Sequence, residues 1–144
     1  RPLLADARLR PTAADIAFTR DAFNDLLAIR SSSTLFRLRT AADVRQRLSF
    51  PITGPAQNAV VLVGHLDGRG YPGANFSELL YFINVDKVAQ TITLPEQAGK
   101  NHQLHSVQAS ANAADTRVRH NAMVDSTSGR FTVPARSAVV YVVR

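Results

Sequence analysis

The sequence predicts a mainly β domain of the sandwich class, and three observations lead to that prediction. Short runs of apolar, β-branched and aromatic residues recur along residues 48–143, with turn residues about every 8–12 positions. The run Leu79–Ile83 is continuously apolar, which is typical of a strand covered on both faces; it is far shorter than the roughly 20 residues of a membrane span. No helical pattern follows residue 47, so a parallel α/β fold is not favoured.

Composition narrows the possible functions. The 144 residues, 45% of them hydrophobic, suffice for one domain with a core. Cysteine is absent, which excludes disulfides, thiolate metal sites and cysteine nucleophiles. The net charge is +6, but the arginines are scattered, so we expect neither nucleic acid nor membrane as a partner. Arg1–Leu4 contains neither an initiator Met nor a signal pattern, so we expect a fragment or a processed chain.

The N-terminal part is predicted to be a loop over residues 1–18, followed by one helix. Thr19 or Asp21 is a suitable N-cap, and Ser31–Ser33 should end the helix because serine competes for backbone hydrogen bonds. Thr40, with Asp43 three residues later, resembles a weak capping box and predicts a short helical turn.

Helical spacing places apolar side chains of the first helix on one stripe, formed by Ala22, Phe23, Leu26 and Leu27. Contiguous apolar patches are rarely left open on monomers. We therefore expect the stripe to be buried, either on the sandwich or against a second copy.

About eight strands are expected beyond this helix. Turns are predicted at Gly54-Pro55, Asp67–Gly73, Pro95–Lys100 and Ser126–Gly129, and a loop is predicted over Ala109–Asp115. The expected strands are residues 48–50, 59–63, 77–86, 90–94, 102–107, 122–125, 130–133 and 137–143.

No metal or cofactor site is predicted. The histidines are His65, His102, His105 and His120. A spacing of three on a strand puts His102 and His105 on opposite faces, whereas zinc needs three or four convergent ligands. We expect surface or edge-strand histidines. Asp67 and Asp86 are expected to form turns at strand ends, and a calcium site there is unsupported.

No catalytic residue is predicted either. Glycoside hydrolysis needs two carboxyl groups across one site, and neither Glu78 nor Glu96 has a carboxylate beside it, so both are expected to lie at the surface. The Gly68–Gly73 segment has a phosphate-loop spacing, but Pro72 removes a backbone donor and no helix start follows. Tyr71 in this loop is a candidate carbohydrate contact.

Six segments, in the same order, resemble one family. Phe23–Phe36 is similar to "LLAIRRSSPLFRL", Gln103–Gln108 to "QLHPVQ" and Phe131–Ser137 to "FTVPARTV". Three further family segments, a strand with an "NTG" turn, a strand ending in "DDG" and the strand "VVVFNA", resemble Arg47–Pro55, Val60–Gly68 and Leu80–Val85 respectively. Thr34 and Leu66 depart from the family pattern. The chain resembles the C-terminal end of pullulanase-type α-1,6-glucosidases, members of glycoside hydrolase family thirteen.

The resemblance implies a Greek-key β-sandwich over residues 41–144, preceded by a helical lead-in over residues 1–40 from a catalytic (β/α)₈ barrel. The family's catalytic motifs belong to the barrel, so it implies no catalytic residue and no cofactor here. The parent would hydrolyse α-1,6 bonds in pullulan, amylopectin or limit dextrins, and would be secreted, periplasmic or, in plants, plastidial.

The domain itself is expected to stabilise the barrel through Phe23, Leu26 and Leu27. The alternatives are an independent carbohydrate-binding module and, less favoured, a basic adaptor for acidic partners.

Overall fold

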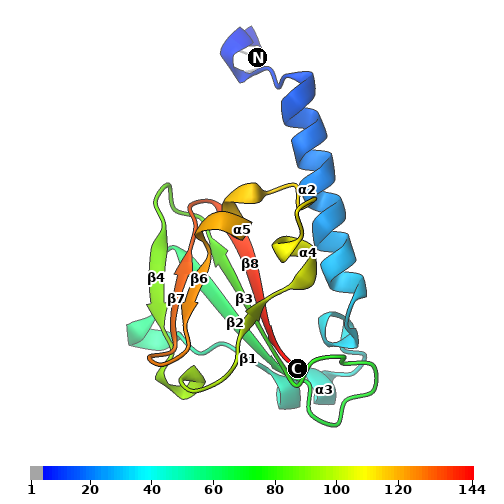
Figure 1. Ribbon diagram of the computed structural model, residues 1–144, viewed down its shortest axis with the longest axis vertical. Helices are drawn as coiled ribbons and strands as arrows, with labels where there is room; N and C mark the ends of the chain where they lie inside the picture. The colour runs from blue at the N-terminus through cyan, green and yellow to red at the C-terminus, as the bar shows by residue number, and fades with distance from the viewer. Residues whose placement is uncertain (1–4) are drawn as a thin grey trace.

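A computed structural model describes residues 5–144 and contains two antiparallel sheets (Figure 1). The larger sheet has the strand order β1-β2-β3-β8-β5, and the smaller one has the order β4-β7-β6. A mainly β fold with antiparallel strands is therefore confirmed; the Greek-key connection stays a prediction. The interpretation of Arg1–Leu4 lies outside the described residues.

The strands are short and most follow the expected runs. Their bounds are β1 Leu48–Ser49, β2 Val61–Asp67, β3 Glu78–Asn84, β4 Gln90–Thr93, β5 Gln103–Leu104, β6 Met123–Asp125, β7 Arg130–Val133 and β8 Ser137–Val143. The α-helices are α2 Ala13–Ser31, α3 Ala41–Arg47, α4 Ser106–Ala109 and α5 Thr116–Asn121, and 3₁₀ turns include η2 Thr34–Arg37 and η4 Pro95–Gln97.

Strand β3 is the centre of the larger sheet. It pairs along its whole length with β2 on one side and with β8 on the other. Successive side chains of a strand point to opposite faces. Leu80 and Phe82 therefore point towards the smaller sheet, whereas Leu79 and Tyr81 point to the outer face. As predicted, both faces of this strand are covered.

The inner core joins the two sheets. Phe82 of β3 packs on Phe131 of β7, with ring centroids 4.9 Å apart, and Tyr141 of β8 lies 5.3 Å from Phe131. Such edge and tilted ring contacts are favourable beyond the area that they bury. The other buried members are Val61, Val63, Leu80, Ile92, Leu94, Val118, Val133 and Val139.

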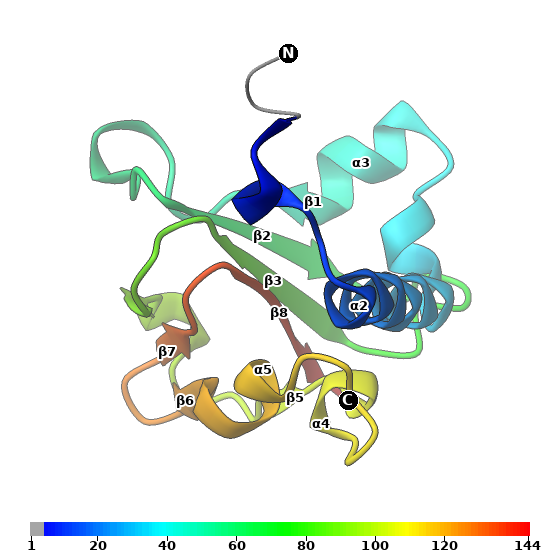
Figure 2. The ribbon, with the colours of Figure 1, turned by 90° about the horizontal axis from the view of Figure 1, so that it is seen from above.

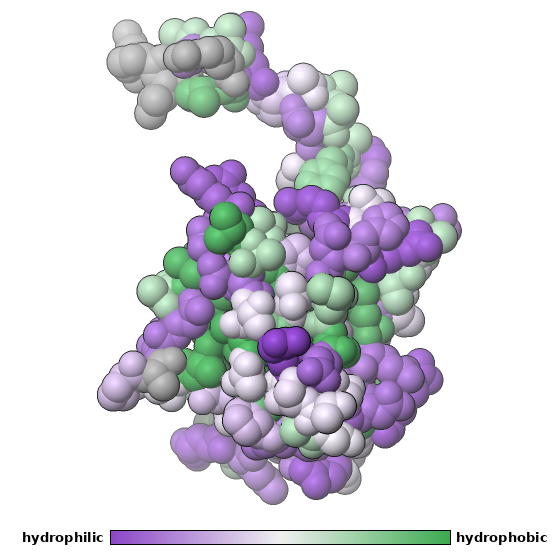
Figure 3. Space-filling view, turned by 60° about the vertical axis from the view of Figure 1, so that its left-hand side comes forward, coloured by the Kyte–Doolittle hydropathy of each residue, from purple (hydrophilic) through white to green (hydrophobic). Residues whose placement is uncertain are grey.

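The outer face of the larger sheet carries α2 and η2, opposite the smaller sheet (Figure 2). Ile29 from the last turn of α2 and Leu35 from η2 are buried with Leu66, Leu79 and Val140 of the strands. Only the C-terminal end of α2 is anchored in this way. Its N-terminal part projects beyond the strands and stands clear of the body (Figures 1 and 3).

Helix α2 is longer than expected, because it begins at Ala13. The prediction of a loop up to residue 18 with an N-cap at Thr19 or Asp21 is wrong. Thr12 is the N-cap: the Asp15 N–H donates to Thr12 Oγ1 at 3.2 Å, and the Thr12 N–H donates to Asp15 Oδ2 at 2.8 Å. This is a capping box with Asp in the place usually taken by Glu or Gln.

The secondary structure predicted for the segment after β4 is also wrong. The expected strand 102–107 is reduced to Gln103–Leu104, and the helices α4 and α5 follow residue 47, where none was expected. Asp115 caps α5 by accepting from the Arg117 N–H at 3.1 Å. The cap of α4 is His105, whose Nδ1 accepts from the Val107 N–H at 3.3 Å. Histidine is not among the preferred N-caps, so α4 could hardly be predicted from its capping residue.

The core assignment can be tested on two neighbouring residues of β3. Phe82 is 0% exposed and Ile83 is 39% exposed. Phe82→Ala should lower the free energy of unfolding by about 3–5 kcal/mol, because it removes a ring from a closely packed core. The matched control Ile83→Ala should cost about 1 kcal/mol. Urea unfolding measures both, and equal losses would contradict the assignment of the inner face.

Candidate functional site

Glu78 of β3 is a buried carboxylate surrounded by basic side chains. The Glu78 side chain is 9% exposed, Lys100 Nζ donates to its Oε2 at 2.6 Å, and His65 Nε2 lies 3.1 Å from the same oxygen. Arg69 Nη2 lies 3.8 Å from Oε1. The expectation that Glu78 is a surface carboxylate is wrong, because alternation along β3 places it on the inner face.

The cluster keeps Glu78 ionised. Burial by itself raises the pKa of this carboxyl, but the hydrogen bonds from Lys100 and His65 outweigh it and hold the pKa below its ordinary value. Glycoside hydrolysis requires one carboxyl group that is held protonated beside a second one. Glu96 is exposed in η4. The Glu78 cluster pairs one ionised carboxylate with cationic and imidazole side chains rather than with a second carboxyl group.

Two histidines that were expected at the surface are buried. His105 is 1% exposed and His102 is 5% exposed. Because the Val107 N–H donates to His105 Nδ1, the proton of the neutral ring lies on Nε2, which contacts Ser32 Oγ at 2.9 Å. Ser32 Oγ in turn donates to the Ile29 carbonyl at 2.7 Å. This chain of hydrogen bonds ties the end of α2 to the segment after β5.

His102 packs in the inner core. Its ring lies edge-on to Phe131, with centroids 5.3 Å apart. Both ring nitrogens are buried without a hydrogen-bond partner among residues 5–144. Burial lowers the pKa of His102, and it also lowers the pKa of His105. Both rings are therefore neutral near pH 7.

The described part of the chain contains neither a metal-binding cluster nor a membrane-spanning helix. No group of three or more His, Cys, Asp or Glu side chains among residues 5–144 is arranged to hold a metal ion. Asp67 and Asp86 form turns, as predicted: Asp67 Oδ1 accepts from the Arg69 N–H, and Asp86 Oδ1 accepts from the Lys87 N–H. None of the described helices has the length and apolar character to cross a membrane.

Tyr71 lies in the glycine-containing loop between β2 and β3 and is half-buried. The Arg47 guanidinium carbon lies 4.6 Å from the centre of its ring. Arg47 Nη1 also donates to the carbonyls of Asp67 at 3.1 Å and Arg69 at 3.0 Å, so it fastens this loop. One ring face of Tyr71 is thus occupied by a cation. Contact of Tyr71 with carbohydrate stays a prediction.

The apolar side chains of α2 form two faces rather than the single predicted stripe. Phe18, Leu26 and Ile29 line clefts against the sandwich. Ile16, Phe23 and Leu27 lie on the other face by helical spacing. Phe23 is 59% exposed and Leu27 is 45% exposed, so burial of the whole stripe on the sandwich is wrong. A helix that is apolar on both sides is typical of one held between two bodies.

The comparisons with known proteins agree with this fold. The whole chain, residues 1–144, matches the family described as alpha-1,6-glucosidases, pullulanase-type, C-terminal. It is 35% identical over 149 residues to pullulanase 1, chloroplastic, of Arabidopsis thaliana, covering 99% of this chain but 15% of the relative. It is 29% identical to the pullulanase of Klebsiella pneumoniae, covering 90% of this chain and 12% of the relative.

A crystal structure of PulA from Klebsiella oxytoca superposes with a TM-score of 0.80 at 28% identity. The match covers 92% of this chain and 12% of that one. The chain thus spans a small part of the length of the proteins that it matches.

The buried histidines predict a pH-dependent stability. Between the lowered pKa of the folded state and the ordinary value of 6.5, the unfolded chain binds more protons. The free energy of unfolding should therefore fall as the pH drops below about 6.5. The Glu78 contribution is lost only as the pH falls below its ordinary value of 4.5, so its window begins at a lower pH than that of the histidines.

The variant His102→Phe keeps the ring contact with Phe131 and removes the titrating group. It should show a shallower fall of the free energy of unfolding below about pH 6.5 in urea unfolding, with the His105 part remaining. Identical pH profiles for the wild type and the variant would contradict the assignment.

Proposed function

Because the chain belongs to the C-terminal family of pullulanase-type alpha-1,6-glucosidases, we propose that it is the non-catalytic domain of a debranching enzyme and stabilises the catalytic barrel of that enzyme. The enzyme would hydrolyse α-1,6 bonds in pullulan, amylopectin or limit dextrins. The two carboxyl groups that this chemistry needs would come from another part of the polypeptide.

The observation that carries this proposal is the uncovered face of α2. Ile16 and Phe23 are each 59% exposed, and they lie on the side of the helix that faces away from the sandwich. Burial of one such side chain contributes roughly 1.5–3 kcal/mol relative to exposure. An isolated helix is also marginal in water, and α2 is anchored only over its C-terminal half, by burial of Ile29 and by Asp25, whose Oδ2 accepts from the Ala114 N–H at 2.7 Å. Docking of this face on the barrel would stabilise both partners.

Leu26 has a different place in this arrangement. It was expected to join Phe23 and Leu27 in one contact with the barrel; it lines the clefts beside the sandwich, yet it is 43% exposed, about as much as Leu27 at 45%. The proposed barrel contact uses Phe23, Leu26 and Leu27, with Ile16 added.

The test uses the natural polypeptide that contains this chain, with Phe23→Asp and Leu27→Asp combined. Loss of apolar docking should speed the irreversible thermal loss of pullulan hydrolysis by about tenfold or more. Met123→Asp is the matched control: Met123 is 61% exposed but lies on the smaller sheet, so this change should have little effect.

A second measurement separates docking from folding of the domain. In the 144-residue chain alone, the double variant should melt close to the wild type, because both side chains are already exposed there. If the variant polypeptide lost activity no faster than the Met123→Asp control, the proposed role would be wrong. Release of reducing sugar from pullulan by the isolated chain would contradict its non-catalytic assignment.

A further inference from the structure

A short segment, residues 105–114, connects α2 to the edge of β8, and we call it the strap. Figure 1 shows it in yellow beside α2. On one side, the Gln108 side chain binds β8: its Nε2 donates to the Ala138 carbonyl at 2.7 Å, and its Oε1 accepts from the Val140 N–H at 2.8 Å. The amide thus satisfies two backbone groups of β8 that β5 does not reach. The strap is therefore fixed to the larger sheet.

On the other side, the strap holds α2 through two hydrogen bonds. His105 Nε2 contacts the Oγ of Ser32, the C-cap of α2, at 2.9 Å. The Ala114 N–H donates to Asp25 Oδ2 at 2.7 Å. Val107 packs on the outer core, but a cleft of about 200 Å³ lies where α2, β8 and the strap meet. Because the strap does not pack continuously on the helix, its hold on α2 depends on these two bonds.

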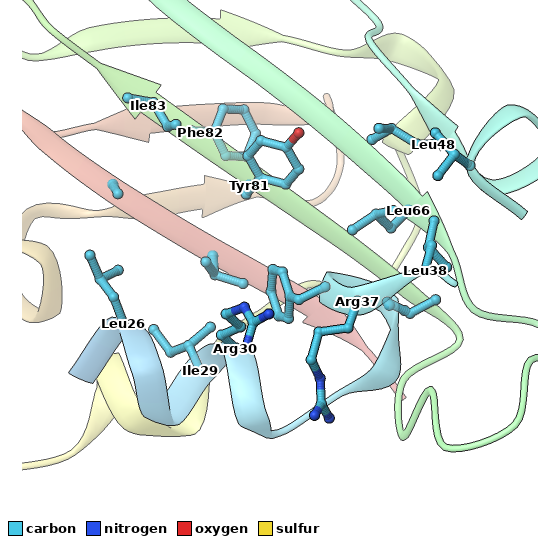
Figure 4. Close-up of a pocket in the computed structure, with 15 residues that line it drawn as sticks. Leu26, Ile29, Arg30, Arg37, Leu38, Leu48, Leu66, Tyr81, Phe82 and Ile83 are labelled. Carbon is cyan, nitrogen blue, oxygen red and sulfur yellow. The ribbon is translucent and has the colours of Figure 1, made fainter. Parts of the chain in front are cut away.

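The end of α2 is held separately. Asn75 Nδ2 donates to the Ser32 carbonyl at 2.6 Å, and the Thr34 N–H donates to the Gly73 carbonyl at 3.0 Å. Ile29 in the last turn is buried, and Figure 4 shows it extending from α2 towards the larger sheet. None of these contacts involves the strap. The helix end can therefore act as a hinge, while the strap sets the angle at which the helix leaves the sandwich.

His105 takes part in both functions of the strap. Its Nδ1 accepts from the Val107 N–H and so caps α4, while its Nε2 carries the proton that faces Ser32. A second proton has to bind at Nδ1, where it would face the Val107 N–H. The acceptor would become a donor, and the cap of α4 would be lost.

The surroundings of His105 do not suit a charged ring. The ring is 1% exposed and lies edge-on to Phe76, with centroids 5.6 Å apart. Among residues 5–144, the charged group that acts on it is Arg144, which is itself a cation. Burial and this cation both disfavour the imidazolium. A protonated ring would therefore leave its place and lose the contact with Ser32.

We propose that the strap is an acid-sensitive latch: protonation of His105 uncaps α4, breaks the contact with Ser32 and lets α2 swing about its C-terminal end. While the latch is closed, burial lowers the pKa of His105. In the open state the ring meets water and regains its ordinary pKa of 6.5. Between these two values the open state binds more protons, so its population rises as the pH falls below about 6.5.

The latch would also affect a larger polypeptide. Where α2 docks on a catalytic barrel, opening of the latch would loosen the joint between the barrel and the sandwich in acid. This consequence rests on the proposed function, whereas the latch itself does not.

The test measures the position of α2 with spin labels and pulsed electron resonance, because the chain contains no cysteine that would also be labelled. Labels at Asn24→Cys in α2 and Thr91→Cys in β4, both exposed, form the helix pair. Labels at Thr91→Cys and Gln103→Cys, both in strands of the sandwich, form the control pair. Near neutral pH the helix pair should give one narrow distance. Below about pH 6.5 a second population should grow by up to about tenfold for each pH unit, while the control pair keeps its distance.

Two results would overturn the latch. One is a helix distance that stays the same at every pH at which the control pair is unchanged. The other is a change that occurs only together with the control pair, because that would be unfolding of the whole domain.

A variant assigns the effect to one ring. In His105→Asn the second population should not depend on pH, because asparagine is a preferred N-cap and does not titrate. His102→Phe and His120→Asn are the controls, one at a buried and one at an exposed histidine, and both should keep the wild-type response. A pH response that persists in His105→Asn, or that is lost in either control, would contradict the role of His105.

Asp25→Ala tests the strap without a change at His105. Because it removes one of the two bonds to α2, it should raise the second population already near neutral pH, and acid should raise it further. A helix distance identical to that of the wild type near neutral pH would contradict the hold of the strap on α2. The measurement needs only this chain, so its outcome does not depend on the proposed barrel contact.

Discussion

Strand β3 has to be covered on both faces, and the rest of the molecule follows from this. Leu79 and Leu80 are neighbours, point in opposite directions and are both 0% exposed. The smaller sheet covers the inner face through Phe131, and the last turn of α2 with η2 covers the outer face through Ile29 and Leu35. The outer cover reaches only part of the sheet, which leaves clefts beside α2 open and the N-terminal part of α2 without support from the strands (Figure 1).

Local patterns were enough to predict most of the strands and turns, because an apolar run or a glycine or proline turn depends only on residues that are adjacent in the sequence. The helices were harder. Helix α2 begins with Thr12 and Asp15, a capping pair with an unusual member, and α4 is capped by His105. The signal for α4 lies in a residue type that the N-cap rules rank low, whereas the Thr12–Asp15 pair has the same pattern as Thr40–Asp43 and could have been predicted. The strand predicted over residues 102–107 is longer than the one that forms, and its pattern was weak because Leu104 and Val107 are its only apolar residues.

Burial of polar groups could not be predicted in the same way, because their partners are distant in the chain. Lys100 is 22 residues from Glu78, and Ser32 is 73 residues from His105. Without the fold, an isolated glutamate or histidine is best placed at the surface. The two faces of α2 also could not be predicted from the sequence, because Phe23, Leu26 and Leu27 fall within one broad apolar arc of the helix. Only the position of the sandwich divides that arc into a covered side and an uncovered one.

The central claim is that α2 is shared between the sandwich and a second body. Hydrogen–deuterium exchange along α2, compared between the 144-residue chain and the natural polypeptide that contains it, tests this most directly. In the isolated chain, residues 25–37 should be protected while residues 13–21 exchange quickly, because Asp25, Ile29 and Leu35 anchor only the later segment. In the natural polypeptide the whole helix should exchange slowly. Equal exchange of residues 13–21 in both proteins would contradict the account.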